Sequence, residues 1–182
     1  MKRRTMLSDF GKGLADIIVG IDPDVDKSGI ALVERRTRRV DVRTLPFPQL
    51  IETIVKLRDA VKERGGNIIV VMEAGYLNKG NWHLNSGDSK AVAAAKGVSA
   101  GRNHQTGRLI AEMCRFHGVM IREARPLPKC WSGPNRKITH DEITEFMGPI
   151  RHTNQDGRDA ALIAWVWAGF PVKVKTQNRN GI

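Results

Sequence analysis

Five short apolar runs along the chain have the length and composition of buried strands. They cover residues 16–22, 30–34, 40–45, 67–72 and 119–123, and they are rich in Val and Ile. The run at 40–45 alternates apolar with polar side chains, which is typical of a strand with one solvated face. Because short connections join the first three runs, we expect them to pair as an antiparallel meander.

Between these runs the apolar positions change to helical spacing. Helices are expected over residues 46–65, 91–117, 139–147 and 154–170. Gly97 and Gly101 leave open whether the second of these helices is broken. Thr139 and Glu142 form a capping box, which marks the start of the third.

The order of the elements is three strands, helix, strand, helix, strand and two helices. Antiparallel strands followed by alternating helices and strands predict an α/β fold, with a mixed five-stranded sheet and helices on both faces. A chain of 182 residues is long enough for one domain with a buried core. We expect this domain to span residues 16–172, between a basic lead-in at 1–15 and a polar tail at 173–182.

The composition adds a strongly basic charge. The chain has 30 Lys and Arg against 19 Asp and Glu, a formal net charge of +11 and a pI of about 10.2. Residues 75–137 hold eleven of these Lys and Arg and only three acids. Scattered basic residues usually only solvate a surface, but this concentration favours contacts with nucleic-acid phosphates. The basic candidates for such contacts are Lys79, Lys90, Lys96, Arg102, Arg136 and Lys137.

Cysteine usage and hydropathy indicate a soluble, cytoplasmic protein. Cys114 and Cys130 show neither metal-ligand spacing nor a disulfide framework, which fits a reducing compartment. No apolar run approaches the roughly 18–20 residues of a membrane span. Asp9, Lys12 and Asp16 interrupt any signal-peptide core. We therefore expect no membrane partner.

Four carboxylates stand where apolar segments begin or end. Asp22 and Glu73 stand at the ends of two of the strands, whereas Asp156 and Asp159 open the last helix, one turn apart on one face. Each has a structural explanation when taken alone, such as a turn cap for Asp22. Gathered together, they would repel one another unless cations neutralised them. Two Mg²⁺ ions prefer such oxygen ligands, with Mn²⁺ as a possible substitute, and a pair about 4 Å apart supports phosphodiester cleavage.

The four acids lie in three short segments, which are VGIDP at 19–23 followed by Ser28-Gly29, VME at 71–73, and DGRDAAL at 156–162. These segments resemble the signatures of RuvC-type Holliday-junction resolvases, which belong to the RNase H-like nuclease superfamily. The resemblance runs from about residue 17 to residue 170. It implies an RNase H-like fold in which Asp22, Glu73, Asp156 and Asp159 form a metal-binding catalytic tetrad. It also implies a homodimer that cuts four-way DNA junctions in recombination and repair.

Further positions resemble this family less closely. Tyr76 falls where these resolvases place an aromatic residue near unpaired bases, and either Tyr76 or Trp82 could stack on a base; Tyr76 could equally just pack on its loop. Lys129 matches the basic residue that the family brings to the active site, where it would stabilise developing charge, unless it is a solvated surface lysine. Residues 105–107 (QTG) resemble the start of the family's dimerising helix.

Two positions depart from the family pattern. Asp24 stands where the family usually has Gly, so it either alters the turn or imitates a metal ligand. Where the family carries a lysine before the short helix, this chain has His140, and either His140 or Lys137 takes that place. Neither departure removes one of the four acids.

These observations predict a Mg²⁺-dependent, structure-specific DNA endonuclease that resolves Holliday junctions as a homodimer. A related nuclease that acts on other branched DNA or on RNA is the alternative within enzymes. A catalytically silent nucleic-acid-binding module is the alternative outside them, although a binder gains nothing from clustering acids beside phosphates. A protein of anionic membrane surfaces is a more remote alternative.

Overall fold

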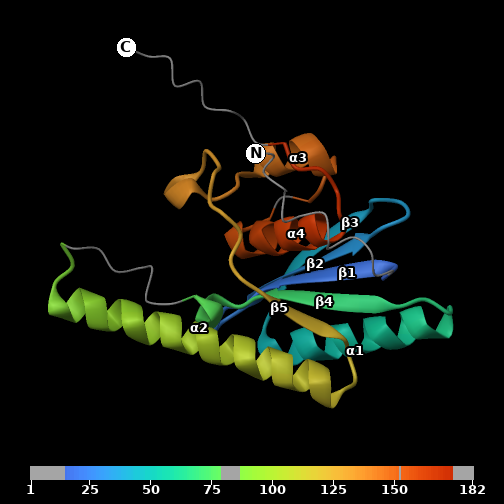
Figure 1. Ribbon diagram of the computed structural model, residues 1–182, viewed down its shortest axis with the longest axis horizontal. Helices are drawn as coiled ribbons and strands as arrows, with labels where there is room; N and C mark the ends of the chain where they lie inside the picture. Colours follow the sequence, from blue (N-terminus) through green and yellow to red (C-terminus); the bar gives the residue numbers. More distant parts are fainter. Residues whose placement is uncertain (1–14, 79–86, 152, 174–182) are drawn as a thin grey trace, which may run out of the picture.

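The fold is built on a five-stranded mixed sheet with the strand order β3-β2-β1-β4-β5 (Figure 1). The structure, a computed structural model, describes residues 15–78, 87–151 and 153–173. The strands are β1 (Ile17–Asp22), β2 (Ser28–Glu34), β3 (Val40–Leu45), β4 (Ile68–Glu73) and β5 (Ile121–Ala124). The first three pair antiparallel, whereas β4 runs parallel to β1 and β5 parallel to β4. The expected α/β fold with a mixed five-stranded sheet is confirmed.

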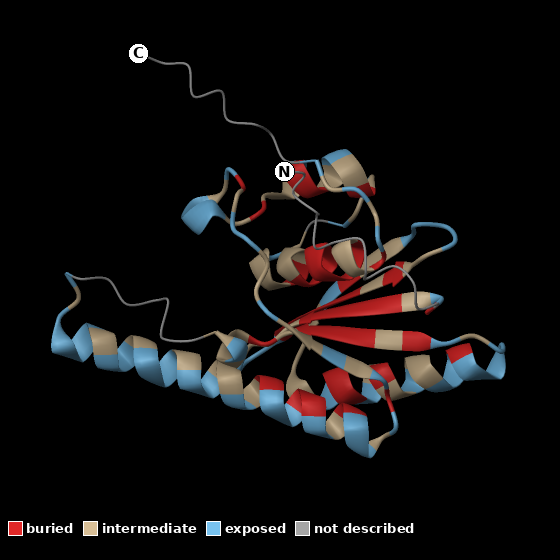
Figure 2. Ribbon diagram, viewed as in Figure 1, coloured by how far each residue is buried: buried red, intermediate tan, exposed pale blue. Residues whose placement is uncertain are grey.

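Helices cover both faces of the sheet and enclose two apolar cores (Figures 1 and 2). The helices are α1 (Phe47–Glu63), α2 (Lys90–Phe116), α3 (His140–Met147) and α4 (Gln155–Trp167). Buried side chains of α1 and α2 pack on one face, among them Ile54 and Ile110. Those of α3 and α4 pack on the other, where Trp165 is the largest fully buried side chain. No helix in the described part of the chain is long and apolar enough to cross a membrane.

Strand alternation assigns each residue of β1 to one of these cores. Val19 and Ile21 lie in the α1/α2 core, and Ile18 lies in the α3/α4 core. Because successive side chains of a strand point to opposite faces, Gly20 and Asp22 share the face of Ile18. By the same alternation, Glu73 shares the α4 face with Val71 on β4. The alternation that builds the cores therefore turns both strand-end acids toward α4.

Helix α4 lies unusually close to the sheet because two glycines face it. A Cβ atom added to Gly20 would meet the carbonyl oxygen of Ala160 and lie 2.9 Å from the backbone nitrogen of Ala164. A Cβ added to Gly29 would meet the carbonyl of Asp156 and lie 2.9 Å from the backbone nitrogen of Gly157. The absence of both side chains lets the helix backbone rest directly on β1 and β2.

Some boundaries differ from the expected ones. Helix α2 runs unbroken through Gly97 and Gly101. Its C-terminal half packs on the sheet, while its N-terminal half is mostly exposed (Figure 2). Residues 75–77 form a single 3-10 turn where a loop was expected. Of the predicted lead-in and tail, only Ala15 and Lys173 are described, and the division into a domain and two tails stays a prediction.

Replacing Gly20 with alanine should lower the free energy of unfolding by about 3 kcal/mol, because the new methyl group overlaps backbone atoms that cannot move independently. Gly97→Ala is the matched control. Its Cβ would meet nothing within 4 Å, so it should raise stability by up to about 1 kcal/mol through helix propensity. Chemical denaturation of the two variants measures both effects. Equal stability of the two variants would contradict the close approach of α4.

Candidate active site

The parallel pairing of β1 and β4 places Asp22 and Glu73 side by side at one end of the sheet. In the register of these strands Ile21 lies opposite Met72, and the two acids are the next residues along. Neighbouring strands lie about 4.8 Å apart. Both side chains also point to the face that α4 covers. The strand ends therefore bring two carboxylates together although 51 residues separate them in the sequence.

The start of α4 brings Asp156 and Asp159 to the same place. The register of β1 and β2 sets Gly29 opposite Asp22, and the first turn of α4 rests on Gly29. Asn154 caps this turn, since its side-chain oxygen accepts a hydrogen bond from the backbone nitrogen of Gly157 at 3.0 Å. All four acids line one cavity of about 230 Å³, together with Lys129 and Lys137.

Burial and mutual repulsion raise the pKa of three of these acids. Burial, followed by the charges of Glu73 and Asp159, raises the pKa of the Asp22 carboxyl well above its ordinary value. Burial and then Asp159 raise the pKa of Glu73. The pKa of Asp156 is also raised, first by burial and then by the charge of Asp24. The cavity thus concentrates negative charge that the fold itself does not require.

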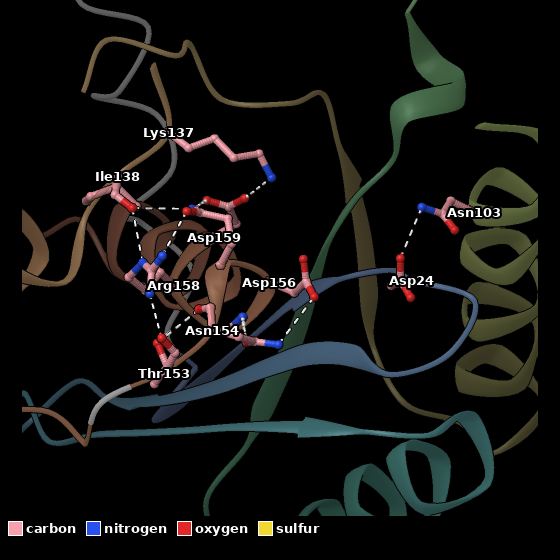
Figure 3. A network of polar contacts seen from close by, with 11 residues as sticks. Asp24, Asn103, Lys137, Ile138, Thr153, Asn154, Asp156, Arg158 and Asp159 are labelled. Atoms are coloured by element: carbon pink, nitrogen blue, oxygen red, sulfur yellow. Dashed lines mark hydrogen bonds and ion pairs between the residues drawn. The ribbon is translucent and has the colours of Figure 1, made fainter. Parts of the chain in front are cut away.

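Lys137 supplies the nearest positive charge. Its ammonium group lies 2.7 Å from Asp159 Oδ2, and the other carboxylate oxygen of Asp159 accepts a hydrogen bond from Gln155 at 2.7 Å (Figure 3). Burial is the largest single influence and lowers the pKa of Lys137. The hydrogen bond to Asp159 and the negative charges of Asp159, Asp22 and Asp156 together outweigh burial, so the net shift of this pKa is upward. Lys129 lies farther along the same loop, and its charge lowers the pKa of Glu73. Lys137, rather than His140, faces the acids; His140 begins α3.

The donor set suits a hard divalent cation, although the side chains are not gathered around one point. Among the described residues, no group of three or more His, Cys, Asp or Glu side chains is arranged to hold a metal ion. The four acids nevertheless offer only carboxylate oxygens, and the raised pKa values of Asp22, Glu73 and Asp156 show that the negative charge of the cavity is incompletely balanced. Oxygen donors with unbalanced negative charge are the chemistry that Mg²⁺ requires.

Buried polar contacts hold the segment that carries both lysines. The carboxylate of Glu142 accepts hydrogen bonds from the backbone nitrogens of Ser132 at 2.9 Å and Thr139 at 3.0 Å. Burial alone would raise the pKa of Glu142, but the backbone and side-chain hydrogen bonds from Thr139 and Ser132 together outweigh burial and lower this pKa. Trp131 is buried and stacks on Phe146 at 6.0 Å between ring centroids. The capping box expected at Thr139 therefore also anchors the loop beside the cavity.

Arg158 is a structural residue that the sequence did not single out. It lies between the two helical acids, and its guanidinium donates to the carbonyl oxygens of Ile138 and Thr153 and to the side chain of Gln155 (Figure 3). These bonds tie the start of α4 to the loop that bears Lys137. The sequence around Arg158 contains no pattern that predicts hydrogen bonds to the carbonyl oxygens of Ile138 and Thr153.

Tyr76 lines the cavity but is already engaged by several partners. Its hydroxyl donates to Glu123, which also pairs with Arg115. The guanidinium of Arg108 covers one ring face at 4.8 Å from the centroid, and His104 meets the ring edge-on. Burial and then the bond to Glu123 raise the pKa of Tyr76. Base stacking by Tyr76 stays a prediction, and on the ring face that Arg108 covers it would require Arg108 to move.

The other candidate nucleic-acid contacts are distributed over several elements. Lys90 and Arg102 are exposed on α2, and Arg136 is exposed next to the cavity loop. Lys96 forms an ion pair with Asp88 at 2.7 Å. Lys79 and Trp82 lie outside the described residues. Residues 105–107 occupy the middle of α2 rather than the start of a helix, because Ser89 caps the helix 16 residues earlier.

Asp24 belongs to the turn after β1 and is tied to α2. Its Oδ1 accepts a hydrogen bond from the backbone nitrogen of Asp26 at 2.9 Å. The amide of Asn103 donates to Asp24 Oδ2 at 3.4 Å and accepts from the backbone nitrogen of Val25 at 3.2 Å (Figure 3). Asp24 thus shapes the turn that follows Asp22 and joins it to the long helix.

Comparison with solved structures finds two of RuvC from Thermus thermophilus, one described as a RuvC structure and one as RuvC in complex with a Holliday junction substrate. The alignments show 15% and 14% identity, respectively, and cover 84% of this chain and 93% and 92% of those chains, with a TM-score of 0.40 in each case. No family model and no curated protein matches the sequence. What the chain does is therefore inferred from its own carboxylates and motifs.

Replacing Asp22 with asparagine should stabilise the ion-free protein at neutral pH. The pKa of Asp22 is higher in the folded protein than in the unfolded chain. Its contribution to stability is therefore fully present below the unfolded pKa, where the carboxyl group is protonated in both states. This contribution is lost as pH rises through the folded pKa, because folding then requires a buried, ionised carboxylate. In a chelating buffer at pH 7, Asp22→Asn should therefore melt a few degrees above the wild type, and the difference should vanish near pH 4. Asp26→Asn is the control, because Asp26 is exposed on the adjacent turn. A lower melting temperature for Asp22→Asn would show that its charge is well compensated.

Exchanging Asp24 and Asn103 tests the link between the turn and α2. Each single change, Asp24→Asn or Asn103→Asp, removes the matched donor and acceptor, whereas the double variant restores them with the roles reversed. A double-mutant cycle on the free energy of unfolding should give a coupling of about 1 kcal/mol. Additive single effects would mean that the 3.4 Å hydrogen bond contributes nothing.

Proposed function

We propose that this chain is a Mg²⁺-dependent, structure-specific DNA endonuclease that resolves four-way junctions. The observation that carries the proposal is the convergence of four carboxylates from three distant segments on one cavity, against burial and mutual repulsion. A fold accepts such a cost at functional sites. The resemblance of the three segments to RuvC-type resolvases supplies the reaction and the substrate.

The acids and the lysines of the cavity would have different roles in the reaction. Asp22, Glu73, Asp156 and Asp159 would hold the divalent ions, with Asp22 most central because its pKa responds to all three other acids. When bound, such ions activate water and stabilise the leaving oxygen of a phosphodiester. Lys129 and Lys137 lie where their charges can stabilise negative charge on the reacting phosphate. Lys137 also fixes the position of Asp159.

A homodimer would let two such sites cut two strands symmetrically. Support comes from the exposed side of α2, where Val98, Leu109 and Phe116 follow one another at helical spacing; Phe116 is 79% exposed. Large apolar side chains in such a row favour burial against a partner. A symmetric pair of helices would use the same residues twice.

One observation favours a catalytically silent binding module as the second candidate. The ammonium group of Lys137 already neutralises Asp159, and the four described acids are not gathered around a common point. A module of this kind would bind junctions without needing divalent ions. Mg²⁺ should therefore change its melting temperature no more than it changes that of Asp22→Asn.

The decisive test is cleavage of a synthetic four-way junction with and without Mg²⁺. Asp22→Asn should reduce cleavage at least about a hundredfold, because loss of an ion ligand removes several kcal/mol of transition-state stabilisation. Junction binding in Ca²⁺ should persist. Asp26→Asn, on the exposed part of the same turn, should cut normally. Wild-type cleavage by Asp22→Asn would overturn the mechanism. If the protein instead cuts a Y-fork, a linear duplex or an RNA–DNA hybrid more readily than a four-way junction, the proposed substrate is wrong, although the protein is still a nuclease.

A further inference from the structure

The turn between β2 and β3 carries four arginines in five residues. Arg35, Arg36, Arg38 and Arg39 flank Thr37, and the last three arginines are exposed. Within the described part of the chain, Arg36, Arg38 and Arg39 form no ion pair. Like charges this close repel one another, so the cluster gives the isolated fold no electrostatic benefit.

The backbone of this turn is held firmly in place. Glu34 and Arg39 close it through a 3.0 Å bond from the backbone nitrogen of Glu34 to the carbonyl of Arg39, and the nitrogen of Arg38 donates to the carbonyl of Glu34 at 2.9 Å. The Thr37 hydroxyl donates to the Glu34 carboxylate at 2.7 Å and accepts from the nitrogen of Arg39 at 3.2 Å. The arginines therefore project from a preformed support, which limits the entropy cost of binding.

Arg38 occupies a conformation that does not favour arginine. Its φ is 59°, in the left-handed region that Gly and Asn adopt more easily. Its guanidinium lies over the ring of Phe170 at 5.0 Å from the centroid, just beyond α4. Glycine would adopt this backbone conformation with less strain than arginine does. The presence of a long cationic residue here therefore points to a role for its side chain.

We propose that this turn is a second binding site for nucleic acid, which contacts the phosphodiester backbone of a duplex at the end of the sheet opposite the carboxylate cavity (Figure 1). The register of β1 and β2 sets Glu34 beside Ile17 and Gly29 beside Asp22, so the length of β1, about 17 Å, separates the two sites. Helix α4 spans a similar distance, about 20 Å, from Asp156 toward Phe170.

The chemistry of the turn favours an extended polyanion. Guanidinium groups match phosphate oxygens as paired donors. Arg36, Arg38 and Arg39 are exposed on one tight turn, so they offer several such donors close together, which suits successive phosphates of one strand. A lipid surface would need apolar anchors beside the cations. Among the described residues, none of the large exposed apolar side chains lies between 34 and 40. Because the turn would contact phosphates and not bases, it would add affinity for the duplex and fix its orientation without specificity for a base sequence.

The test compares two triple variants in which the same number of positive charges is removed. Arg36→Gln, Arg38→Gln and Arg39→Gln are combined in one protein. The control combines Arg43→Gln, Lys56→Gln and Arg151→Gln, three exposed cations outside the turn. Binding to a fluorescent linear duplex is followed by anisotropy across a salt series in a chelating buffer. The affinity of the turn variant should fall about tenfold or more at low salt, and its log–log salt slope should flatten by about 0.9 for each phosphate that it no longer neutralises. The control should stay close to wild type.

Wild-type affinity and slope in the turn variant, or an equal fall in the control, would overturn the proposal. Arg38→Gly guards against misfolding, because it relieves the left-handed backbone and should weaken duplex binding while preserving or raising the melting temperature. If the turn variant no longer binds phosphatidylserine vesicles but keeps duplex binding, the ligand is a membrane and the proposal is wrong. No divalent ion or cleavage enters these measurements, so their outcome is independent of the proposed nuclease activity.

Discussion

The close seating of α4 on the sheet is the constraint on which the site depends. Gly20 and Gly29 leave no side chain between the helix and the strands, so the helix backbone lies directly against β1 and β2. Had either position carried a methyl group, α4 would stand farther from the sheet, and Asp156 and Asp159 would move away from Asp22. The two glycines thus matter for where charged groups meet, and only secondarily for the turn chemistry usually associated with glycine.

That seating has an electrostatic cost which the fold offsets only in part. Asp22, Glu73 and Asp156 have raised pKa values because burial and like charges act together. Lys137 compensates at Asp159, on one side of the cavity. The remaining imbalance is what a divalent cation would relieve, and a core without a function would have no reason to keep it. Stability and proposed activity therefore oppose each other at Asp22.

The sequence predicts the sheet and its acids well because both follow from local periodicity. Apolar runs in the sequence mark the strands. Because successive side chains of a strand point to opposite faces of the sheet, Asp22 and Glu73 lie on the same face. Long-range partners leave no such trace. The residues around Tyr76 do not indicate that its hydroxyl donates a hydrogen bond to Glu123, 47 residues away. The sequence also does not indicate that Arg108 covers the Tyr76 ring. Helix α2 runs unbroken through two helix-weakening glycines in its mostly exposed half, between a Ser89 cap at its start and a C-terminal half that packs on the sheet. These features arise only when distant segments meet.

Helix α4 also relates the two sites for which we propose functions. Its first turn carries Asp156 and Asp159, and just beyond its last turn Phe170 lies beneath the guanidinium of Arg38. Since α4 is largely buried and rests on the sheet without intervening side chains, the spacing between the cavity and the arginine turn is set by a rigid element. About 20 Å corresponds to roughly six base pairs of rise in a duplex. A phosphate backbone held at the turn would therefore be positioned relative to the carboxylates by the helix that supplies two of them.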